Sequence, residues 1–414
     1  MSLLIKGFFM IEQLEAFYGL PNKVKYCKKC VISNQRPSSS VEFRNSNTKK
    51  QTIAFDENGV CDACLYNEIK KTTNWKERED MLFQILEKYR SNDGSYDCIV
   101  PSSGGKDSSF TAYKLKYKYG MNPLTVTWAP SMYTKVGWRN LQGLINVGGI
   151  DNMLYSPNGR LHRLLTKLAF LNLGHPFQPF IHGQKIIGPR ISNNFKIPLI
   201  VYGENQAEYG NSISDNFKIN MDKKFFTIDD PMEMIMGGVR IKDIIKDYDF
   251  KYNDFSAYLP LKEEDVKISN TSKIYLGYFE KWDPQECYYF SVENTGFQAA
   301  DERSDGTYSK YTEIDDKMVP FHFYMTLIKF GIGRATYDAA QEIRNGKITR
   351  EEGVHLARKY DQEFPHKYFK EFLEYIDITE DFFRETVDKF RSPHLWFREN
   401  GEWRLRHTVW HDIQ

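Results

Sequence analysis

Residues 102–109 read Ser-Ser-Gly-Gly-Lys-Asp-Ser-Ser, a run whose residue types are those of a phosphate-binding loop. Glycines let backbone N–H groups approach an anion closely, and serine hydroxyls donate to phosphate oxygens. A β-prone run, 96–101, precedes the loop, and a helical pattern follows it as far as Gly120. This order predicts a strand, a loop and a helix N-terminus, whose dipole favours negative charge. We therefore expect phosphate to be held by Ser102, Ser103, Gly104, Gly105, Lys106, Asp107, Ser108 and Ser109.

The spacing of this loop differs from the Walker pattern, which places four residues between its first Gly and its Gly-Lys-Ser/Thr. The compact Ser-Gly-Gly-Lys-Asp-Ser of residues 103–108 instead resembles the PP-loop of ATP pyrophosphatases. That resemblance implies cleavage of ATP between the α and β phosphates and adenylation of a substrate oxygen. Lys106 is then expected near the β and γ phosphates. The alternative is an ordinary Ser/Gly turn with a surface lysine.

A second predicted strand, 197–202, also ends in groups that suit a nucleotide. Carboxylates at the carboxyl end of a parallel strand that faces a phosphate loop are natural Mg²⁺ ligands. We expect nucleotide or Mg²⁺ contacts here from Gly203, Glu204, Asn205 and Glu208, with Asp107 as a second candidate ligand. Trp128 ends the strand 123–128 and is expected to line the adenine pocket. The alternatives are a solvated polar turn and a tryptophan of the core.

Four of the six cysteines form two Cys-x-x-Cys pairs, Cys27 with Cys30 and Cys61 with Cys64. Each pair closes a tight knuckle, and together they supply the four thiolates of a tetrahedral Zn²⁺ site. We expect structural zinc; a redox or iron–sulfur role is the alternative, and disulfides are disfavoured because nothing else indicates an oxidising compartment. The remaining two, Cys98 and Cys287, are expected to be buried apolar residues rather than nucleophiles.

Arg334 follows Gly331-Ile332-Gly333 at the start of a predicted helix. A guanidinium group there suits bidentate contact with a phosphate or a substrate carboxylate. The alternative is a helix cap and a packing contact. His175 and His182 flank a Pro-containing loop, and we expect both to be structural rather than catalytic bases.

Strand and helix patterns alternate through the middle of the chain. The strands 96–101, 123–128, 153–155 and 197–202 are separated by helical patterns, and a last strand is expected at 273–279. Such alternation predicts an α/β fold with a parallel sheet, helices on both faces and ligands at the carboxyl ends of the strands. We divide the chain into an N-terminal extension with the cysteine knuckle, an ATP pyrophosphatase core with an insertion near 206–270, and a mainly helical C-terminal region: 1–70, 71–285 and 286–414.

The composition limits the partners of this chain. Its 56 basic and 55 acidic residues give a net charge of +1, which does not indicate a nucleic-acid-binding surface. No apolar run reaches the roughly 18 residues that span a bilayer. The apolar start, residues 3–11, is short and contains Lys6, so we do not expect a signal peptide. We expect a cytoplasmic protein with no nucleic-acid or membrane partner.

Taken together, the motifs resemble the N-acetyl sugar amidotransferase family, the bacterial surface-polysaccharide enzymes of the WbpG and PseA type. The resemblance runs from about residue 25 to about residue 405. The matching motifs are Tyr-Cys-x-x-Cys-Val at 26–31, Gln-Arg-Pro at 35–37, Phe-Asp-x-x-Gly-Val-Cys-Asp-Ala-Cys at 55–64, Ser-Gly-Gly-Lys-Asp-Ser at 103–108, Tyr-Gly-Glu-Asn at 202–205, Glu-Tyr-Gly at 208–210, Gly-Tyr-Phe at 277–279, Trp-Asp at 282–283 and Lys-Phe-Gly-x-Gly-Arg-Ala-Thr at 329–336. Three features depart from the family pattern: the lead-in before Cys27, the extra segment 38–52, and Tyr337 in place of an acidic residue. They leave the identity of the sugar substrate undecided.

The resemblance implies an amidine-forming ligase of O-antigen or flagellar glycan biosynthesis. ATP adenylates the N-acetyl oxygen of a sugar or nucleotide sugar, ammonia replaces AMP at the carbon, and an acetamidino group results. Ser103, Lys106, Asp107 and Arg334 are the expected catalytic residues, and ATP, Mg²⁺ and structural Zn²⁺ the expected cofactors. Because the sequence has no glutaminase signature, the family further implies separate glutaminase and cyclase-like subunits that supply ammonia.

Two other functions compete with this one. Some PP-loop enzymes that thiolate tRNA or form lysidine also carry zinc knuckles, although they usually have a basic face and the thiolases need a further reactive cysteine. The second competitor is a zinc-organised assembly scaffold with a vestigial nucleotide site. Salt-dependent tRNA binding tests the first, and sugar-dependent conversion of ATP to AMP tests the second.

Overall fold

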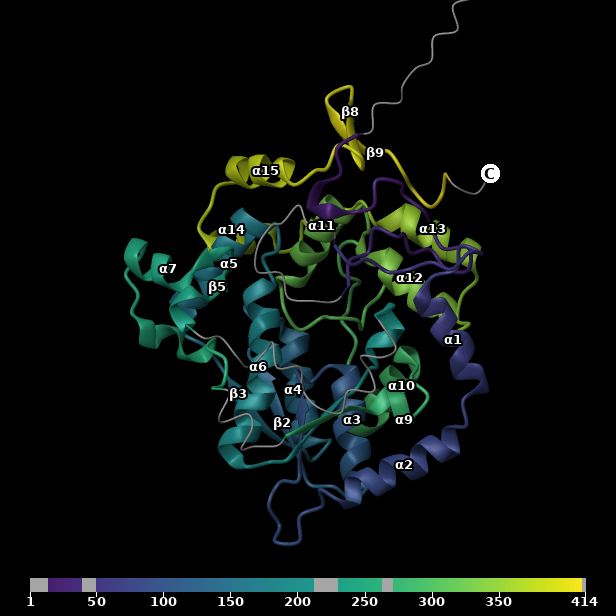
Figure 1. Ribbon diagram of the computed structural model, residues 1–414, viewed down its shortest axis with the longest axis vertical. Helices are drawn as coiled ribbons and strands as arrows, with labels where there is room; N and C mark the ends of the chain where they lie inside the picture. Colours follow the sequence, from purple (N-terminus) through teal and green to yellow (C-terminus); the bar gives the residue numbers. More distant parts are fainter. Residues whose placement is uncertain (1–13, 39–49, 212–229, 263–270, 412–414) are drawn as a thin grey trace, which may run out of the picture.

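The computed structural model describes residues 14–38, 50–211, 230–262 and 271–411 (Figure 1). The apolar start at 3–11, most of the extra segment 38–52 and part of the insertion near 206–270 lie outside these residues. Among the described helices, none is long and apolar enough to cross a membrane.

A five-stranded sheet forms the centre of the nucleotide-binding part. Its strand order is β3-β2-β1-β4-β7, and every neighbouring pair is parallel. The strands are β1 (Cys98–Pro101), β2 (Pro123–Trp128), β3 (Asp151–Tyr155), β4 (Leu199–Tyr202) and β7 (Ser272–Tyr275). β2 has the bounds expected from the sequence. The last expected strand is shorter, because the chain turns into the helix α9 (Leu276–Phe279) and Gly277 donates its backbone N–H to the carbonyl of Gly203 at 2.8 Å.

Helices cover both faces of the sheet, and alternate side chains of each strand point to opposite faces. Ile99 and Ile200 pack in one apolar core, with residues of α6 (Gln178–Phe195), which contacts α5 (Gly159–Leu173). Cys98 and Val100 pack in the other, beneath α3 (Lys106–Tyr117), and α10 (Pro284–Thr295) lies against α3 and α4 (Lys135–Asn146). The predicted α/β fold is confirmed, and the expected burial of Cys98 and Cys287 is observed.

The N-terminal part runs along one side of the molecule before it enters the sheet (Figure 1). It comprises η1 (Phe17–Gly19), the cysteine-bearing segment, α1 (Asp62–Thr72) and α2 (Trp75–Glu87). After β4, the described part of the insertion contains η2 (Gln206–Tyr209), η5 (Pro231–Glu233), β5 (Ile235–Met236), β6 (Val239–Arg240), α7 (Ile241–Asp247) and η6 (Tyr252–Ala257).

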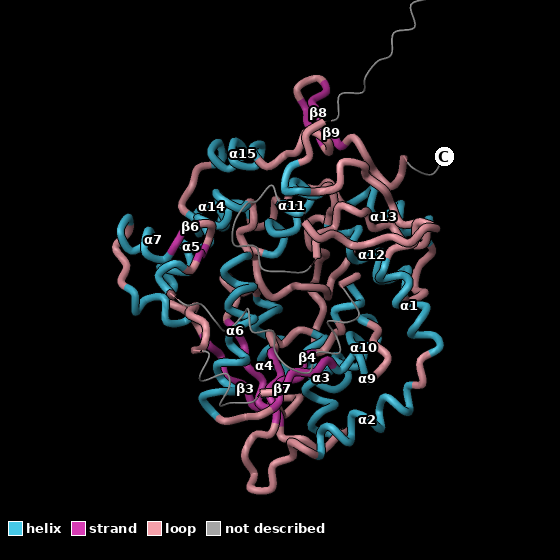
Figure 2. The backbone as a smooth tube through the Cα atoms, in the orientation of Figure 1, coloured by secondary structure: helices cyan, strands magenta, loops and turns pink. Residues whose placement is uncertain are grey.

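The C-terminal region is mainly helical, as expected, and lies above the sheet in Figure 2. Its elements are α11 (Val319–Phe330), α12 (Arg334–Arg344), α13 (Arg350–Tyr360), α14 (Phe369–Ile376), α15 (Glu380–Lys389), β8 (Trp396–Glu399) and β9 (Glu402–Leu405). Thr349 and Glu352 form a capping box at the start of α13, and the Thr379 side chain caps α15. The three-part division at residues 70 and 285 stays a prediction.

The segment 312–316 joins the C-terminal region to the sheet domain. Thr134 donates its backbone N–H to the carbonyl of Asp315 at 3.0 Å. The carboxylate of Asp316 accepts backbone N–H groups from Ser131 and Met132. This segment is therefore held firmly beside the N-terminus of α4 and close to the loop that follows β1.

Candidate active site

A cavity of about 1160 Å³ opens where the sheet domain meets the C-terminal region. One end is lined by residues 101–108, which follow β1, and by Glu204, which follows β4. The rest is lined by α6, the segment 312–315 and the helices α11 and α12. The cavity therefore lies at the carboxyl ends of the strands, where ligands of parallel sheets bind.

The loop between β1 and α3 has a backbone that only glycine suits at one position. Gly104 has a φ of +81°, and a Cβ there would lie 2.5 Å from the Cα of Leu141. The Ser102 hydroxyl accepts the N–H of Gly104 at 3.1 Å and donates to the Ser108 hydroxyl at 2.8 Å. These contacts hold Ser103, Gly105 and Lys106 along the cavity wall at the start of α3. In sequence, backbone and position this loop resembles a PP-loop.

Lys106 and Asp107 form a charge pair at this end of the cavity. Lys106 is buried, which opposes its charge, but the carboxylate of Asp107 outweighs this effect and raises the pKa of Lys106. Oδ1 of Asp107 is shielded from solvent and has no hydrogen-bond partner among the described residues. A cation or a water bound to it would satisfy that oxygen.

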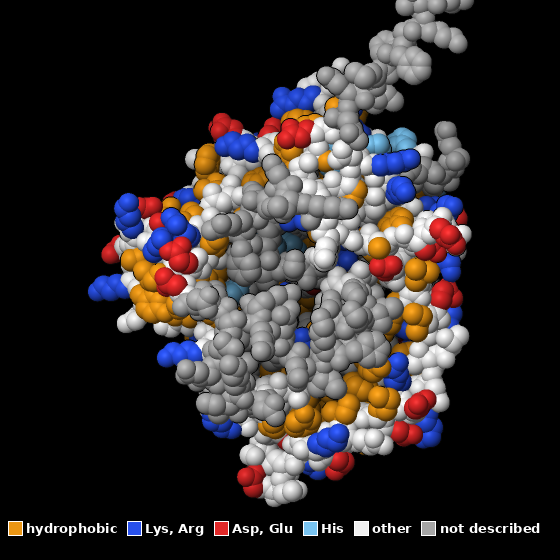
Figure 3. Space-filling view, in the orientation of Figure 1, with side chains coloured by type: hydrophobic (Ala, Val, Ile, Leu, Met, Phe, Trp, Pro, Cys, Tyr) orange, Lys and Arg blue, Asp and Glu red, His pale blue; other side chains and the backbone are white. Residues whose placement is uncertain are grey.

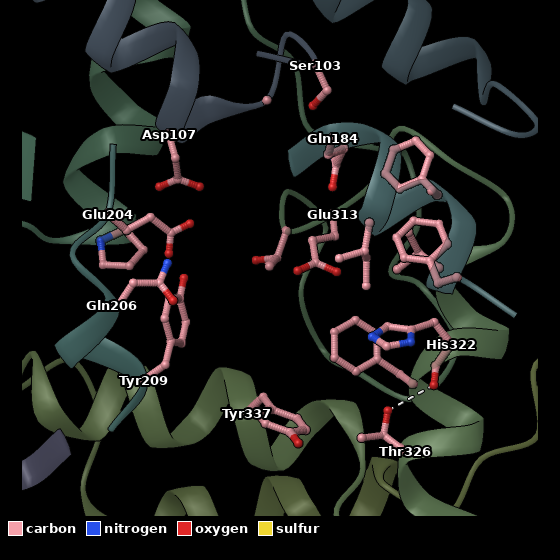
Figure 4. Close-up of a pocket in the computed structure, with 18 of the residues that line it drawn as sticks. Ser103, Asp107, Gln184, Glu204, Gln206, Tyr209, Glu313, His322, Thr326 and Tyr337 are labelled. Atoms are coloured by element: carbon pink, nitrogen blue, oxygen red, sulfur yellow. Dashed lines mark hydrogen bonds between the residues drawn. The ribbon is translucent and has the colours of Figure 1, made fainter. Parts of the chain in front are cut away.

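Glu204 lies beside Asp107, and their carboxylates face each other in Figure 4. Burial raises the pKa of Glu204 to about 8, and repulsion from Asp107 contributes to the rise. Two converging carboxylates, one with an unpaired oxygen, fit the hard oxygen donors that Mg²⁺ takes beside phosphates. Asp107 and Glu204 are the residues that would hold Mg²⁺, whose charge would neutralise a leaving pyrophosphate.

Several residues expected at the nucleotide site lie outside the cavity wall. Ser109 is fully buried. Asn205 is also buried, and its side chain caps η2 by accepting the N–H of Ala207. Gly203 packs so closely that a Cβ there would lie 2.8 Å from Trp282. Trp128 lines the cavity, but its indole also presses on Gly183 and stacks on Tyr155 with centroids 5.5 Å apart. Trp128 thus combines the expected lining role with the core role that was its alternative.

Glu208, expected to contact the nucleotide or Mg²⁺, lies outside the cavity wall and forms an ion pair. Its carboxylate contacts Nζ of Lys70 at 2.7 Å, and Lys70 also donates to the carbonyl of Trp282 at 2.9 Å. Both side chains are nearly buried, so the pair ties α1 to η2. Glu208 does not line the cavity, unlike Asp107 and Glu204, so it is not placed to share a metal ion with them.

Arg334 is likewise placed differently from the expected phosphate clamp. Its side chain is buried, and Nη2 donates to the carbonyls of Thr312 and Glu313. It therefore lies behind the segment 312–315 and supports that segment instead of lining the cavity. The spacing Gly-x-Gly-Arg indicated a helix start correctly, but it did not reveal the chain segment in front of the guanidinium group.

The acidic side chains of this segment were missed from the sequence. Glu313 and Asp315 both line the cavity, and Ser103 donates to the carboxylate of Asp315. Burial raises the pKa of Asp315, and the bond from Ser103 opposes that rise. The run Glu-Ile-Asp-Asp at 313–316, just before a predicted helix, was the available signal.

The cavity beyond the loop is lined by aromatic rings. His175 and His322 stack with centroids 5.0 Å apart, and Phe177 lies 5.4 Å from His322. Burial lowers the pKa of His175 to about 3 and lowers that of His322 as well. Both imidazoles are therefore neutral at pH 7 and suit apolar faces or hydroxyl groups of a substrate. Figure 4 shows His322 facing the same cavity as Glu313.

The four cysteines of the two Cys-x-x-Cys pairs come together as predicted. Their sulfur atoms lie within 4.8 Å of one another, and all six cysteines of the chain are free of disulfides. The Cys27 sulfur accepts N–H groups from Lys29, Cys30 and Cys61. Four buried sulfurs at this separation fit a tetrahedral metal ion.

The cysteine cluster also contacts the wall of the cavity. Arg350 of α13 donates to the carbonyls of Cys27 and Cys30 at 3.4 and 3.2 Å. Arg36, just after the first pair, donates to the carbonyl of Tyr209 and lies 5.8 Å from the ring of Tyr337. Because Tyr209 and Tyr337 line the cavity, a metal in this cluster would stabilise part of its wall.

Acidic and basic side chains are interspersed over the described surface in the view of Figure 3. The described residues on this face form no extended area of one charge, in keeping with the net charge of +1. Roles in catalysis and in nucleotide contact stay predictions for the individual site residues.

Comparison with known families adds one match in the C-terminal region. Residues 305–409 match the family described as "LPS biosynthesis protein WbpG-like, C-terminal domain". This range includes the segment 312–316 and the helices α11 and α12, which line the cavity opposite the loop. For these residues, the predicted resemblance to WbpG-type enzymes is confirmed.

One curated relative and two solved structures are also similar to this chain. "Uncharacterized protein MJ1599" of Methanocaldococcus jannaschii is 34% identical over 87 residues, which are 21% of this chain and 31% of the relative's length. The U34-tRNA thiolase NcsA of Methanococcus maripaludis, solved with its [4Fe-4S] cluster, is 12% identical with a TM-score of 0.30, over 77% of this chain and 89% of its own. NMN synthetase of Francisella tularensis is 14% identical with a TM-score of 0.27, over 69% and 96%.

Proposed function

Since residues 305–409 form a WbpG-like C-terminal domain beside a PP-loop, we propose that this chain is an ATP-dependent N-acetyl sugar amidotransferase. The reaction would join ammonia to the acetamido group of a sugar or nucleotide sugar of surface-polysaccharide biosynthesis. ATP would be converted to AMP and pyrophosphate. The observation that carries the proposal is that one cavity is lined by both the loop and the WbpG-like domain.

The first step would be adenylation of the acetamido oxygen. The oxygen attacks the α phosphorus, the bond from that phosphorus to the bridging oxygen breaks, and pyrophosphate leaves. Backbone N–H groups at the start of α3, together with Lys106, would stabilise the charge that develops on the phosphates. Mg²⁺ held by Asp107 and Glu204 would supply further charge neutralisation. The neutral aromatic end of the cavity would receive the sugar.

The second step would replace AMP by ammonia at the same carbon. An amide oxygen is a poor leaving group, whereas AMP leaves readily because its charge is stabilised on phosphate. Ammonia adds to the carbon and AMP departs with the electron pair of the broken C–O bond. The product is an acetamidino group, and no nucleophilic side chain of the protein is required. Cys98 and Cys287 are both buried, in agreement with this scheme.

The reaction is tested by mass spectrometry of candidate sugars incubated with the protein, ATP, Mg²⁺ and an ammonium salt. A UDP-linked diacetamido uronate and a diacetamido nonulosonic acid are the two substrates to compare. We expect a product in which one oxygen is replaced by NH, formed together with AMP. Asp107→Ala is expected to lower turnover by about 10²-fold or more, since it removes a metal ligand at the phosphates. Formation of ADP, or AMP formation that does not depend on a sugar, would contradict the proposal.

Ammonia is expected to come from a separate glutaminase with a cyclase-like subunit. The purified chain should therefore use ammonium chloride and give no product with glutamine alone. Addition of the partner subunits should restore activity with glutamine. The measurement is product formation under the three conditions at equal nitrogen concentration. Full activity of the lone chain with glutamine would show that this part of the proposal is wrong.

We propose Zn²⁺ for the four-cysteine cluster, with a structural role. Four sulfur ligands in a closed, buried site are typical of structural zinc. An iron–sulfur cluster is the second candidate for this site, because it takes the same four thiolates.

tRNA thiolation is the second candidate function. A tRNA substrate would require binding that weakens steeply with salt.

A further inference from the structure

Glu313 combines an unusual backbone with an unpaired carboxylate. It is one of the few described non-glycine residues with a positive φ, 45°. Left-handed backbone is costly for a residue with a Cβ and persists only where the surroundings impose it. Such outliers concentrate at functional sites, so the position of this side chain requires an explanation.

Contacts on both sides of Glu313 impose this backbone. Arg334 donates to the Glu313 carbonyl at 3.2 Å, from behind the segment. Thr134 donates its hydroxyl to the carbonyl of Ile314 and its N–H to that of Asp315. The segment is thus held between α12 and α4. As a result, the Glu313 side chain projects into the cavity, on the side facing Asp107 and Glu204 (Figure 4).

Three other acidic groups of the cavity each have a hydrogen-bond or ion-pair partner, although Oδ1 of Asp107 stays unpaired within the described part of the chain. Asp107 pairs with Lys106, Asp315 accepts from Ser103, and Asp338 accepts the hydroxyl of Thr307. Among the described residues, the Glu313 carboxylate has neither a hydrogen-bond donor nor an ion-pair partner. Glu204 has no such partner among those residues either, but it lies beside Asp107 as a candidate Mg²⁺ ligand, whereas Glu313 lies across the cavity from both (Figure 4).

We infer that Glu313 is the catalytic residue that accepts the proton from ammonia as the new C–N bond forms. This inference rests on the proposed function. When the phosphates are bound at the loop, the adenylated carbon would lie between the loop and the aromatic end of the cavity. Glu313 projects into that space, and a carboxylate there attracts ammonium and stabilises the positive charge that develops on nitrogen.

The step is balanced with the groups named. The ammonia lone pair forms a bond to the adenylated carbon and gives a tetrahedral intermediate with an –NH₃⁺ group. Glu313 takes one proton from that group. The C–O bond to AMP then breaks, AMP leaves with the electron pair, and the amidinium product remains. Without the proton acceptor, the intermediate would expel ammonia again more readily than AMP.

The charges around Glu313 agree with this role. Burial raises the pKa of Glu313 to about 7, with Asp338 and Asp315 favouring the protonated form and Arg334 and Lys106 opposing it. A base whose pKa lies near the operating pH transfers protons most effectively.

Separate assays of the two half-reactions test the inference. Sugar-dependent exchange of pyrophosphate into ATP reports adenylation, and amidine formation with saturating ammonium chloride reports both steps. The sugar is whichever of the two named diacetamido compounds the wild type converts. Glu313→Gln should leave exchange unchanged and lower amidine formation by about 10²–10⁴-fold, the range for loss of a general base. Glu385→Gln, the same change at an exposed residue, should alter neither rate.

A second variant separates chemistry from folding. Glu313→Gly suits the positive φ and should fold normally, yet it should lose amidine formation and regain part of it when formate is added as an external base. Equal losses in both half-reactions, or amidine formation by Glu313→Gln at the wild-type rate, would overturn the inference. In either case a wild type that makes amidine leaves the proposed function intact. A wild type inactive with both sugars would instead reject that function.

Discussion

A Gly104→Ala variant is expected to lose ATP binding by about 10²-fold, the scale that a displacement of about 1 Å produces at a reacting site. Gly104 has a φ of +81°, and the added Cβ would lie 2.5 Å from the Cα of Leu141 and 2.6 Å from its backbone nitrogen. Backbone atoms of α4 cannot move aside as a flexible side chain does, so the loop itself must shift. We also expect unfolding free energy to fall by roughly 1–3 kcal/mol. Calorimetric titration with ATP and thermal denaturation measure the two effects.

Gly94→Ala is the matched control for this experiment. Gly94 has nearly the same φ, +82°, but nothing lies within 4 Å of a Cβ built there. The Gly94→Ala variant should lose unfolding free energy because alanine disfavours the left-handed backbone, but its affinity for ATP should not change. Normal ATP affinity in Gly104→Ala would mean that the loop does not hold the nucleotide phosphates. An equal loss of ATP affinity in both variants would mean that backbone strain alone causes the effect.

A Cys61→Ser variant is expected to lose the bound metal and much of the stability of the N-terminal part. A structural Zn²⁺ contributes about 10–16 kcal/mol to the folding of isolated zinc fingers, and a hydroxyl replaces a thiolate ligand poorly. Metal content by mass spectrometry should fall from about one Zn²⁺ per chain to near zero. Thermal denaturation should begin at a lower temperature. Without the metal, the backbone around the cysteines is no longer held in place, so the hydrogen bonds from Arg350 to Cys30 and from Arg36 to Tyr209 are weakened.

Lys29→Ala provides the control, since Lys29 lies between the first two cysteines and its side chain is 48% exposed. Its ion pair with Glu68 is at the surface, where such pairs contribute little to stability. This variant should retain the metal. Visible absorbance of the wild type distinguishes the two candidates, because an iron–sulfur cluster is coloured and zinc is not. A wild type that contains no metal would contradict the predicted metal site.

The sheet domain could be predicted from sequence because its signals are local. The loop 102–109 follows a short apolar run and precedes a helix, and all three elements form within 25 residues of chain. The Cys-x-x-Cys pairs are equally local, and their grouping needs only the metal chemistry of four thiolates. The helices of the C-terminal region also start at local signals, such as the Thr349–Glu352 capping box of α13.

The side of the cavity opposite the loop could not be predicted, because it depends on contacts between distant parts of the chain. Nothing near Arg334 in the sequence indicates that residues 312–313 lie in front of it. Glu208 follows a core strand, as a metal ligand would, but its partner Lys70 lies 138 residues away. Glu313 was missed for the same reason, since its importance comes from a cavity that three separate segments enclose.

The shared cavity has a consequence for how such enzymes diversify. Its phosphate end belongs to the sheet, whereas the surface opposite belongs to residues 305–409. Under the proposed function, substitutions in the latter would alter which acetamido sugar is recognised without disturbing the loop at which ATP is cleaved. New sugar preferences would then arise by changes in one part of the chain while the phosphate-binding part stays the same.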